Sequence, residues 1–296
     1  MDSTLSTVGL PVALGIIMFG LGLSLTVADF ARVRRSPRAV AVALLCQLVL
    51  LPVVCFGLVL ALDLPPLLAV GMMLLAASPG GSTANLFSHL FGGDVALNIT
   101  LTAINSVVAI VSLPIVTNLA MAYFDLGDEV SLQYRKVVEV FAVVLVPVIL
   151  GMVVRAKRPD FADRMDKPVR IGSAVLLLII IVGIVADQRS NVVDYAASIG
   201  LAVVIFCTVN LLVGFLVPAW AGVTERQAVA CSFEIGVHNA TLAIYVAVEV
   251  LDSVELSVPA AVYGLLMFPL AALWGLALTR WILPRTESWT LPSHHG

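Results

Sequence analysis

The chain has 296 residues, of which 60% are hydrophobic and 12% charged, with a net charge of −3 and a mean hydropathy of +1.07. A soluble domain has about 45–50% apolar and about 25% charged residues, so this composition excludes an ordinary soluble protein. Apolar runs of about 20 residues, the length that crosses about 30 Å of hydrocarbon as a helix, recur along the chain. We therefore expect an all-α integral membrane protein.

About nine such runs predict transmembrane helices. In chain order they lie at about 7–28, 39–61, 66–90, 95–122, 134–154, 170–187, 197–220, 226–249 and 256–280. The first run lacks the basic leader of a signal peptide, and we expect it to remain as a span. Charged segments such as 32–38 and 155–170 separate the runs, and no soluble domain fits between them. The whole chain, 1–296, is expected to form a single transmembrane domain.

Lysine and arginine are distributed unequally between the alternate loops. One side receives Arg32, Arg34, Arg35, Arg38, Arg155, Lys157, Arg158, Arg164, Lys167, Arg170, Arg226, Arg280 and Arg285, and the other receives Arg135, Lys136 and Arg189. Because cytoplasmic loops carry the excess of positive charge, the first side is predicted to be cytoplasmic. We expect a multi-pass protein of the cell inner membrane, with its N-terminus outside and its C-terminus in the cytoplasm.

Two spans contain segments that interrupt a transmembrane helix. The third contains Ser78–Asn85, with one proline and two glycines, and the eighth contains Glu234–Thr241, with a carboxylate, an imidazole and an amide. Proline and paired glycines break a helix and free backbone polar groups. Irregular backbone at this depth is tolerated only where protein buries it or where it lines a wet cavity. We therefore predict two broken helices.

The two interrupted spans occupy matching positions in the chain. Spans one to four, about 7–122, and spans six to nine, about 170–280, form two sets, with an extra helix at about 134–154 between them. The broken span is third in each set, and the sets start on opposite sides of the membrane, which predicts an inverted repeat. Interrupted helices at corresponding places in two halves point to the binding site of a transporter.

Glu234 is the sharpest single feature of the sequence. A charged side chain near the bilayer centre costs about 2.5–3.5 kcal/mol on insertion scales. No lysine or arginine is predicted at comparable depth, so a bound cation or a proton is the natural partner for this carboxylate. The alternative is a protonated Glu234 that is hydrogen-bonded to the backbone.

Other polar groups at similar depth offer the oxygen ligands that a hard cation such as sodium prefers. They are Gln47, Asn85, Asn98, Thr102, Asn105, Glu234, Asn239 and Thr241, with backbone carbonyls near Gly80, Gly81, Ile235 and Val237. Taken singly, each amide or hydroxyl is more often a group that hydrogen-bonds between helices. His238 is either a neutral hydrogen-bonding group, which we favour, or a proton acceptor.

No basic side chain is predicted at mid-depth to meet an anionic substrate. The amides and dipoles at the N-termini of half-helices can do so instead. Ser82, Thr83, Asn239 and Thr241 are therefore the candidate substrate-binding residues. A small organic anion, sodium and the bilayer are the expected partners, and nucleic acid is not.

Five segments of the chain carry a family resemblance. They are Gly15–Leu23, Gln47 with Pro52, Ser78–Asn85, Gly93–Leu97 and Glu234–Asn239. Together they resemble the motifs of the bile acid:sodium symporter family over essentially the whole chain. The resemblance implies a panel domain and a core domain, with two broken helices crossing in the core and two sodium sites behind the crossover.

The resemblance also implies which residues form the two sodium sites. One site would use Asn85, Thr102, Glu234 and the position of Asn98. The other would use Gln47, Glu234, His238 and the backbone carbonyls of Ile235 and Val237.

The sequence departs from the family pattern in three places. Bacterial members usually have one further helix at the N-terminus, which we expect this chain to lack, as the nine-helix animal members do. Residue 84 is alanine where serine is common, which removes an oxygen from the first site. Residue 238 is histidine where glutamine is common, and imidazole offers nitrogen in place of a carbonyl oxygen. Whether the second sodium site exists is therefore an open question. We favour two bound sodium ions, because Gln47, Glu234 and the two carbonyls remain as oxygen ligands.

A sodium-coupled symporter that works by alternating access accounts best for these features. The first alternative is a proton-coupled or uncoupled transporter or exporter on the same fold. An intramembrane enzyme is not expected, because the sequence has neither an HExxH motif nor a GxSG nucleophile motif. A receptor or structural protein would leave the paired broken helices and Glu234 unexplained.

Overall fold

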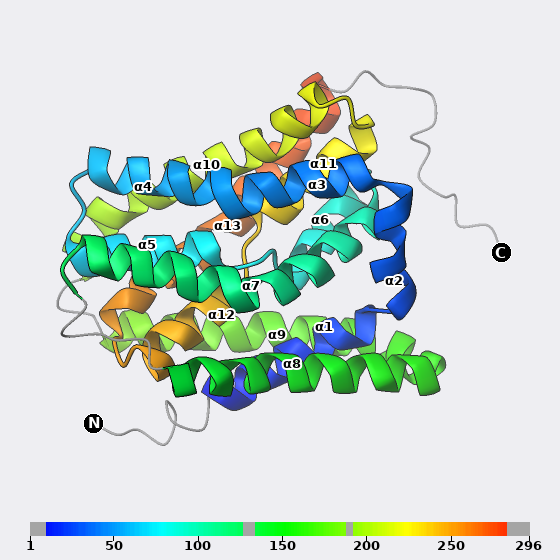
Figure 1. Cartoon of the computed structure of the whole chain (residues 1–296), viewed down its shortest axis with the longest axis horizontal. Helices are drawn as coiled ribbons and strands as arrows, with labels where there is room; N and C mark the ends of the chain where they lie inside the picture. The colour runs from blue at the N-terminus through cyan, green and yellow to red at the C-terminus, as the bar shows by residue number, and fades with distance from the viewer. Residues whose placement is uncertain (1–9, 127–133, 188–191, 283–296) are drawn as a thin grey trace.

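The computed structural model describes residues 10–126, 134–187 and 192–282, and within these ranges every regular element is helical (Figure 1). The helices before the first break are α1 (Leu10–Ser24), α2 (Val27–Ala31), η2 (Arg32–Arg35), α3 (Pro37–Leu45), η3 (Cys46–Leu50), α4 (Leu51–Ala61), α5 (Pro66–Ala77), α6 (Ser82–Leu90) and α7 (Val95–Tyr123). Those that follow are α8 (Tyr134–Lys157), α9 (Pro159–Asp187), α10 (Val192–Trp220), α11 (Glu225–Gly236), α12 (Ala240–Tyr245), η4 (Val246–Val250), η5 (Glu255–Ser257), α13 (Val258–Ala277) and η6 (Leu278–Ile282).

Several of these helices are suited to a membrane. Among the described residues, four continuous helices are long and apolar enough to cross a bilayer: Pro37–Ala61, Val95–Tyr123, Ile199–Trp220 and Glu255–Arg280. A bent pair, Leu14–Ser24 with Val27–Arg35, would make a fifth. Pro66–Ala77 and Ala240–Val250 are apolar but too short to cross alone, because a break lies beside each of them. The chain is thus a multi-pass membrane protein that is all-helical in its described part, and nine spans and an inverted repeat stay predictions.

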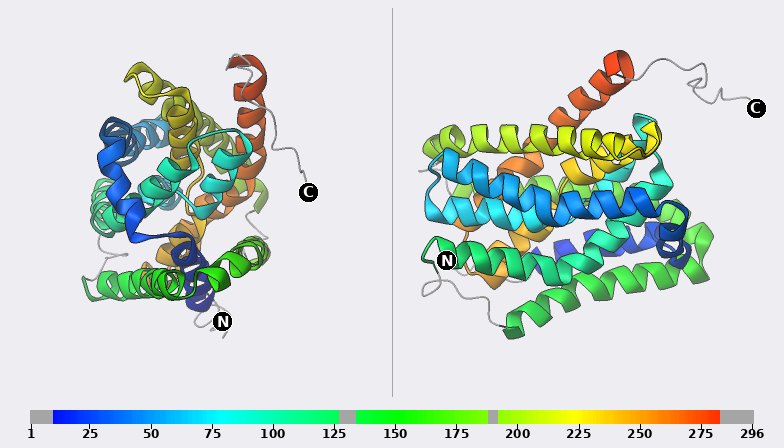
Figure 2. Two further views of the ribbon diagram at one scale, coloured as in Figure 1. Left: turned by 90° about the vertical axis from the view of Figure 1, so that its right-hand side faces the viewer. Right: turned by 45° about the horizontal axis from the view of Figure 1, so that its top comes forward.

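The helices lie in two layers. Helix α1 packs against α8 and α9, and these three lie together along one side of the molecule (Figures 1 and 2). The second layer holds α3 to α7, α10, α11 and α13, in which α10 packs against α11 and α13, and α5 packs against α7. The layers meet where α12 contacts α1 and where α13 contacts α9.

Two glycines allow α1 and α8 to approach closely. A Cβ atom on Gly22 would overlap the backbone carbonyl of Val148, and one on Gly151 would overlap the carbonyl of Phe19. Backbones that come this close need small residues at the contact, as is common between transmembrane helices. The pair therefore fixes α1 against α8.

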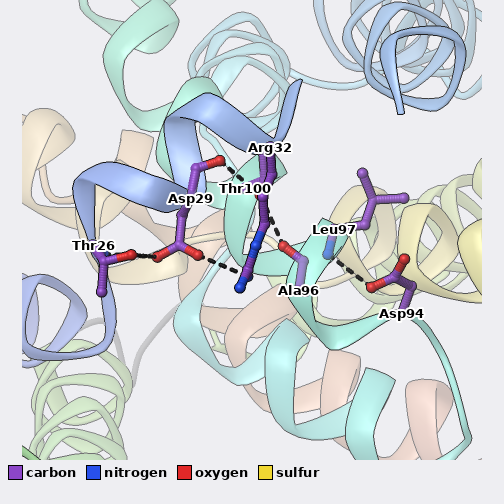
Figure 3. Close-up of polar contacts among 7 residues, drawn as sticks. All are labelled: Thr26, Asp29, Arg32, Asp94, Ala96, Leu97 and Thr100. Carbon is purple, nitrogen blue, oxygen red and sulfur yellow. Dashed lines mark hydrogen bonds and ion pairs between the residues drawn. The ribbon is translucent and has the colours of Figure 1, made fainter. Parts of the chain in front are cut away.

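The first predicted span, 7–28, is not continuous. Helix α1 ends at Ser24, and the chain bends by 67° before α2 begins at Val27. The reason is a cap: Asp29 Oδ2 accepts hydrogen bonds from the backbone N–H and the hydroxyl of Thr26, both at 2.7 Å (Figure 3). The pattern of Thr26 followed three residues later by Asp29 is a capping-box signature that starts a new helix.

The same aspartate joins the bend to the second layer. Asp29 is 4% exposed, and its Oδ1 accepts from Arg32 Nη1 at 2.9 Å. Its backbone carbonyl accepts from the Thr100 hydroxyl on α7 at 3.0 Å (Figure 3). These bonds therefore hold the bend at which the chain passes from the layer of α1, α8 and α9 into the second layer.

The segment 155–170, expected to separate two spans, is largely helical. Helix α8 continues to Lys157 and α9 begins at Pro159, so only Arg158 lies between them. Arg155 and Asp163 form an ion pair across this turn. Charged residues end an apolar run without ending a helix, which is why the hydropathy boundary at about 170 missed the first turns of α9.

Candidate functional site

Two helices break and meet near the middle of the second layer. Helix α5 ends at Ala77 and α6 begins at Ser82, while α11 ends at Gly236 and α12 begins at Ala240. The Gly81 N–H donates to the Val237 carbonyl at 2.8 Å, and the Asn239 N–H donates to the Pro79 carbonyl at 2.8 Å. This short antiparallel bridge satisfies backbone groups that each break would otherwise leave unpaired in an apolar environment.

Gly80 brings one break against the carboxylate of the other. A Cβ atom at Gly80 would overlap the side-chain carboxyl carbon and Oε1 of Glu234. Only glycine can occupy this position without displacing the carboxylate. The proline–glycine segment thus both interrupts the helix and admits Glu234 to the crossing point.

Glu234 is fully buried and its carboxylate is held by helix α7. Its Oε2 accepts from the Thr102 hydroxyl at 2.5 Å, and its Oε1 accepts from Asn105 Nδ2 at 3.0 Å. No ion pair joins it to a cationic side chain anywhere in the described ranges. An ionised carboxylate buried in this way needs a partner of opposite charge.

Three asparagines lie on helices α6 and α7, which pack against each other and against α11, the helix that carries Glu234. Asn85 lies on α6, and Asn98 and Asn105 lie on α7; all three are buried. Asn98 Nδ2 donates to the Ser88 hydroxyl at 2.9 Å and to the Ala230 carbonyl at 2.8 Å, which fixes its amide. The Oδ1 atom of each asparagine has no hydrogen-bond partner in the structure. Buried oxygens without partners are the donors that a cation would use.

A second polar network surrounds His238. Its Nδ1 lies 3.0 Å from the Ser78 carbonyl, and its Nε2 lies 3.1 Å from Asn210 Nδ2 on α10. Gln47 Nε2 donates to the same Ser78 carbonyl at 3.0 Å. The Tyr263 hydroxyl on α13 donates to the Gly236 carbonyl at 2.9 Å. Three helical segments, η3, α10 and α13, are therefore tied to the crossing point from this direction.

The donor set favours a hard cation. Within the described part of the chain, no group of three His, Cys, Asp or Glu side chains could hold a metal ion. The available groups are amide, hydroxyl and carbonyl oxygens around one carboxylate, which suit alkali or alkaline-earth ions rather than zinc or copper.

Comparison with known proteins identifies the family. The profile of the sodium bile acid symporter family matches residues 11–195, more than half of the chain. The chain belongs to this family. Family membership makes it a membrane transporter rather than an enzyme.

The curated relatives are distant but extensive matches. The chain is 28% identical over 256 residues to the uncharacterized sodium-dependent transporter YocS of Bacillus subtilis, over 86% of this chain and 77% of that protein. It is 27% identical over 239 residues to the human ileal sodium/bile acid cotransporter, over 80% and 68% of the two chains. A match of 27% over 278 residues to the probable sodium/metabolite cotransporter BASS2, chloroplastic, of Oryza sativa covers 94% of this chain but only 64% of that protein. Sodium-dependent transport is common to these names.

The structure brings the residues of the first expected sodium site onto neighbouring helices. Thr102 bonds directly to Glu234, while Asn85 and Asn98 lie on the helices packed around it. Of the second expected set, Gln47 and His238 share the Ser78 carbonyl. The Val237 carbonyl, just after the end of α11, already accepts a hydrogen bond from the Gly81 N–H. Ile235, near the end of α11, is fully buried.

The residues expected to meet a substrate have different surroundings. Ser82 begins α6, but its side chain lies outside the described set, and Thr83 is half-buried in the same first turn. Asn239 is 8% exposed, and its Oδ1 accepts from the Leu242 N–H at 3.1 Å, so it caps α12. Thr241 is buried at 3% exposure.

Two residues near the crossing point, Asn210 and Tyr263, are not among the candidates that the sequence offers. Asn105 is one of the polar candidates but belongs to neither of the two expected sodium sites. Asn210 carried a usable signal, because it is the only amide side chain in the run 197–220, and an intramembrane polar residue is a functional candidate by default. The role of Tyr263 depends on contacts between distant helices, which sequence spacing does not reveal.

Proposed function

We propose that this chain is a secondary active transporter that couples the movement of a small organic anion to sodium across the cell membrane. The observation that carries the proposal is Glu234, a fully buried carboxylate bonded to Thr102 and Asn105, with unpartnered asparagine oxygens on the helices packed against its own. Sodium would neutralise the carboxylate and complete the coordination of those oxygens.

Alternating access is supported by the two-layer arrangement. The layer of α1, α8 and α9 would act as the panel, and the second layer, which contains the crossing point, as the core. Movement of one layer against the other would expose the site to each side in turn. Sodium on Glu234 would favour the conformation that accepts the anion, because an anion beside an unneutralised carboxylate is repelled.

An organic anion is the proposed substrate class. The names of relatives include a human sodium-dependent organic anion transporter, 26% identical over 241 residues. In this chain the first turn of α6, with Ser82 and Thr83, would present backbone N–H groups to the anion. The protein is proposed to lie in the cell inner membrane with its N-terminus outside.

The proposal is tested by uptake into proteoliposomes that contain the purified full-length protein. A panel of labelled carboxylates and sulfonates is offered with an inward sodium gradient and, in parallel, with choline in place of sodium. We expect at least one compound to accumulate only with sodium. Accumulation driven equally by an inward proton gradient in choline would instead favour the proton-coupled alternative.

A further inference from the structure

The two sides of Glu234 differ in how their oxygens are used. The asparagine side consists of Asn85, Asn98, Thr102 and Asn105, and the histidine side consists of Gln47, Ser78, Asn210 and His238. On the asparagine side, three amide oxygens have no hydrogen-bond partner, and Thr102 and Asn105 bond to the two carboxylate oxygens of Glu234. On the histidine side, hydrogen bonds within the protein occupy most of the groups.

Both ring nitrogens of His238 already form hydrogen bonds within the protein. A carbonyl oxygen only accepts, so Nδ1 carries the proton and donates it to the Ser78 carbonyl at 3.0 Å. In a neutral ring Nε2 then accepts, and Asn210 Nδ2 donates to it at 3.1 Å. The ring stacks on Phe206, with centroids 6.0 Å apart, and meets Tyr263 edge-on at 5.4 Å. No lone pair of the imidazole is left for a cation.

Two carbonyls of the histidine side already accept hydrogen bonds. The Ser78 carbonyl accepts from both Gln47 and His238, and the Val237 carbonyl accepts from Gly81 at 2.8 Å. Gln47 Oε1 and Asn210 Oδ1 stay without partners, on two different helices. Calcium, another hard cation, takes about 6–8 oxygens, and these two amide oxygens fall short of such a shell even when the Glu234 carboxylate and the Ile235 carbonyl are added.

We infer that this transporter binds a single sodium ion, on the asparagine side, and that His238 is a neutral brace between the two broken helices rather than a cation ligand. The inference rests on the proposed function and alters the expectation of two ions. Asn105 positions Glu234 Oε1 through its Nδ2 and offers its Oδ1 to the same ion. With one sodium and one monovalent anion, the transport cycle moves no net charge.

Equilibrium binding of radioactive sodium to the purified full-length protein tests this without a known substrate. We expect one sodium per chain for the unmodified protein and for Gln47→Leu. His238→Gln replaces the brace with an amide that can turn an oxygen to the site, and we expect two sodium ions per chain. Adding Gln47→Leu to His238→Gln should return the count to one.

A second set of variants tests the asparagine side. Asn105→Leu should weaken sodium binding at least tenfold, whereas Asn118→Leu, an exposed position on the same helix, should leave it unchanged. Two sodium ions on the unmodified protein, or loss of an ion in Gln47→Leu alone, would overturn the inference and leave the proposed function standing. A His238→Gln variant that still binds one sodium ion per chain would also contradict the role of His238 as a brace. No sodium on the unmodified protein would overturn the proposed function itself.

Discussion

Glu234 and Gly80 bring the two broken helices close together. The carboxylate is buried to 0% exposure and occupies the space that a side chain at Gly80 would need. A glycine in a membrane segment is easily taken for a helix breaker alone. Here it also sets how near the backbone comes to the one buried carboxylate that we assign to sodium.

Gly80→Ala tests that contact. The added methyl group forces the carboxylate or the backbone to shift, and overpacking of this kind costs about 1–3 kcal/mol. We expect a lower thermal unfolding midpoint in detergent and weaker sodium binding. Gly57→Ala is the matched control, because a Cβ there meets nothing within 4 Å. Equal effects of the two substitutions would show that the approach of Gly80 to Glu234 is not tight.

The helical elements could be predicted from sequence where the signal is local. Pro79 and the two glycines that follow it predict the break between α5 and α6. The polar run after Glu234 predicts the break between α11 and α12. The bend after Ser24 was missed because hydropathy continues through it, although the Thr26–Asp29 capping box marked it. The bond between His238 and Asn210 joins residues 28 positions apart, one in the break before α12 and the other on α10, so no spacing rule could predict it.

The bend between α1 and α2 depends on Asp29. Asp29→Ala removes the acceptor for Thr26 and the partner of Arg32, and losing a helix cap costs about 0.5–2 kcal/mol. We expect a lower unfolding midpoint in detergent and reduced transport at equal protein. Asp29→Asn keeps an oxygen for the cap, so its unfolding midpoint and its transport should fall less than those of Asp29→Ala.

Arg32→Gln and Arg34→Gln form a matched pair for the same corner. Arg32 bonds to Asp29, whereas Arg34 is exposed on the same turn. The first substitution should lower the unfolding midpoint and the second should not. If both variants were as stable as the unmodified protein, the ion pair would have no part in holding the bend.

At the scale of the whole molecule, the placement of charge predicts the orientation. The basic residues of η2 and of the turn between α8 and α9 fall on the side assigned to the cytoplasm. Reporter fusions after Arg285 should be active in the cytoplasm, and fusions after Asp63 or Asp125 should be active in the periplasm. A cytoplasmic N-terminus would contradict the nine-span topology and the inverted repeat together.

The central claim is that a sodium ion on Glu234 couples transport of the anion. Glu234→Gln keeps the shape of the side chain but removes the charge that balances the ion. The most direct measurement compares sodium-driven uptake by the unmodified protein and by Glu234→Gln in proteoliposomes, using the compound identified from the panel. We expect equal insertion and loss of sodium-driven accumulation in the variant. Sodium-driven accumulation that is unchanged in Glu234→Gln would contradict the claim.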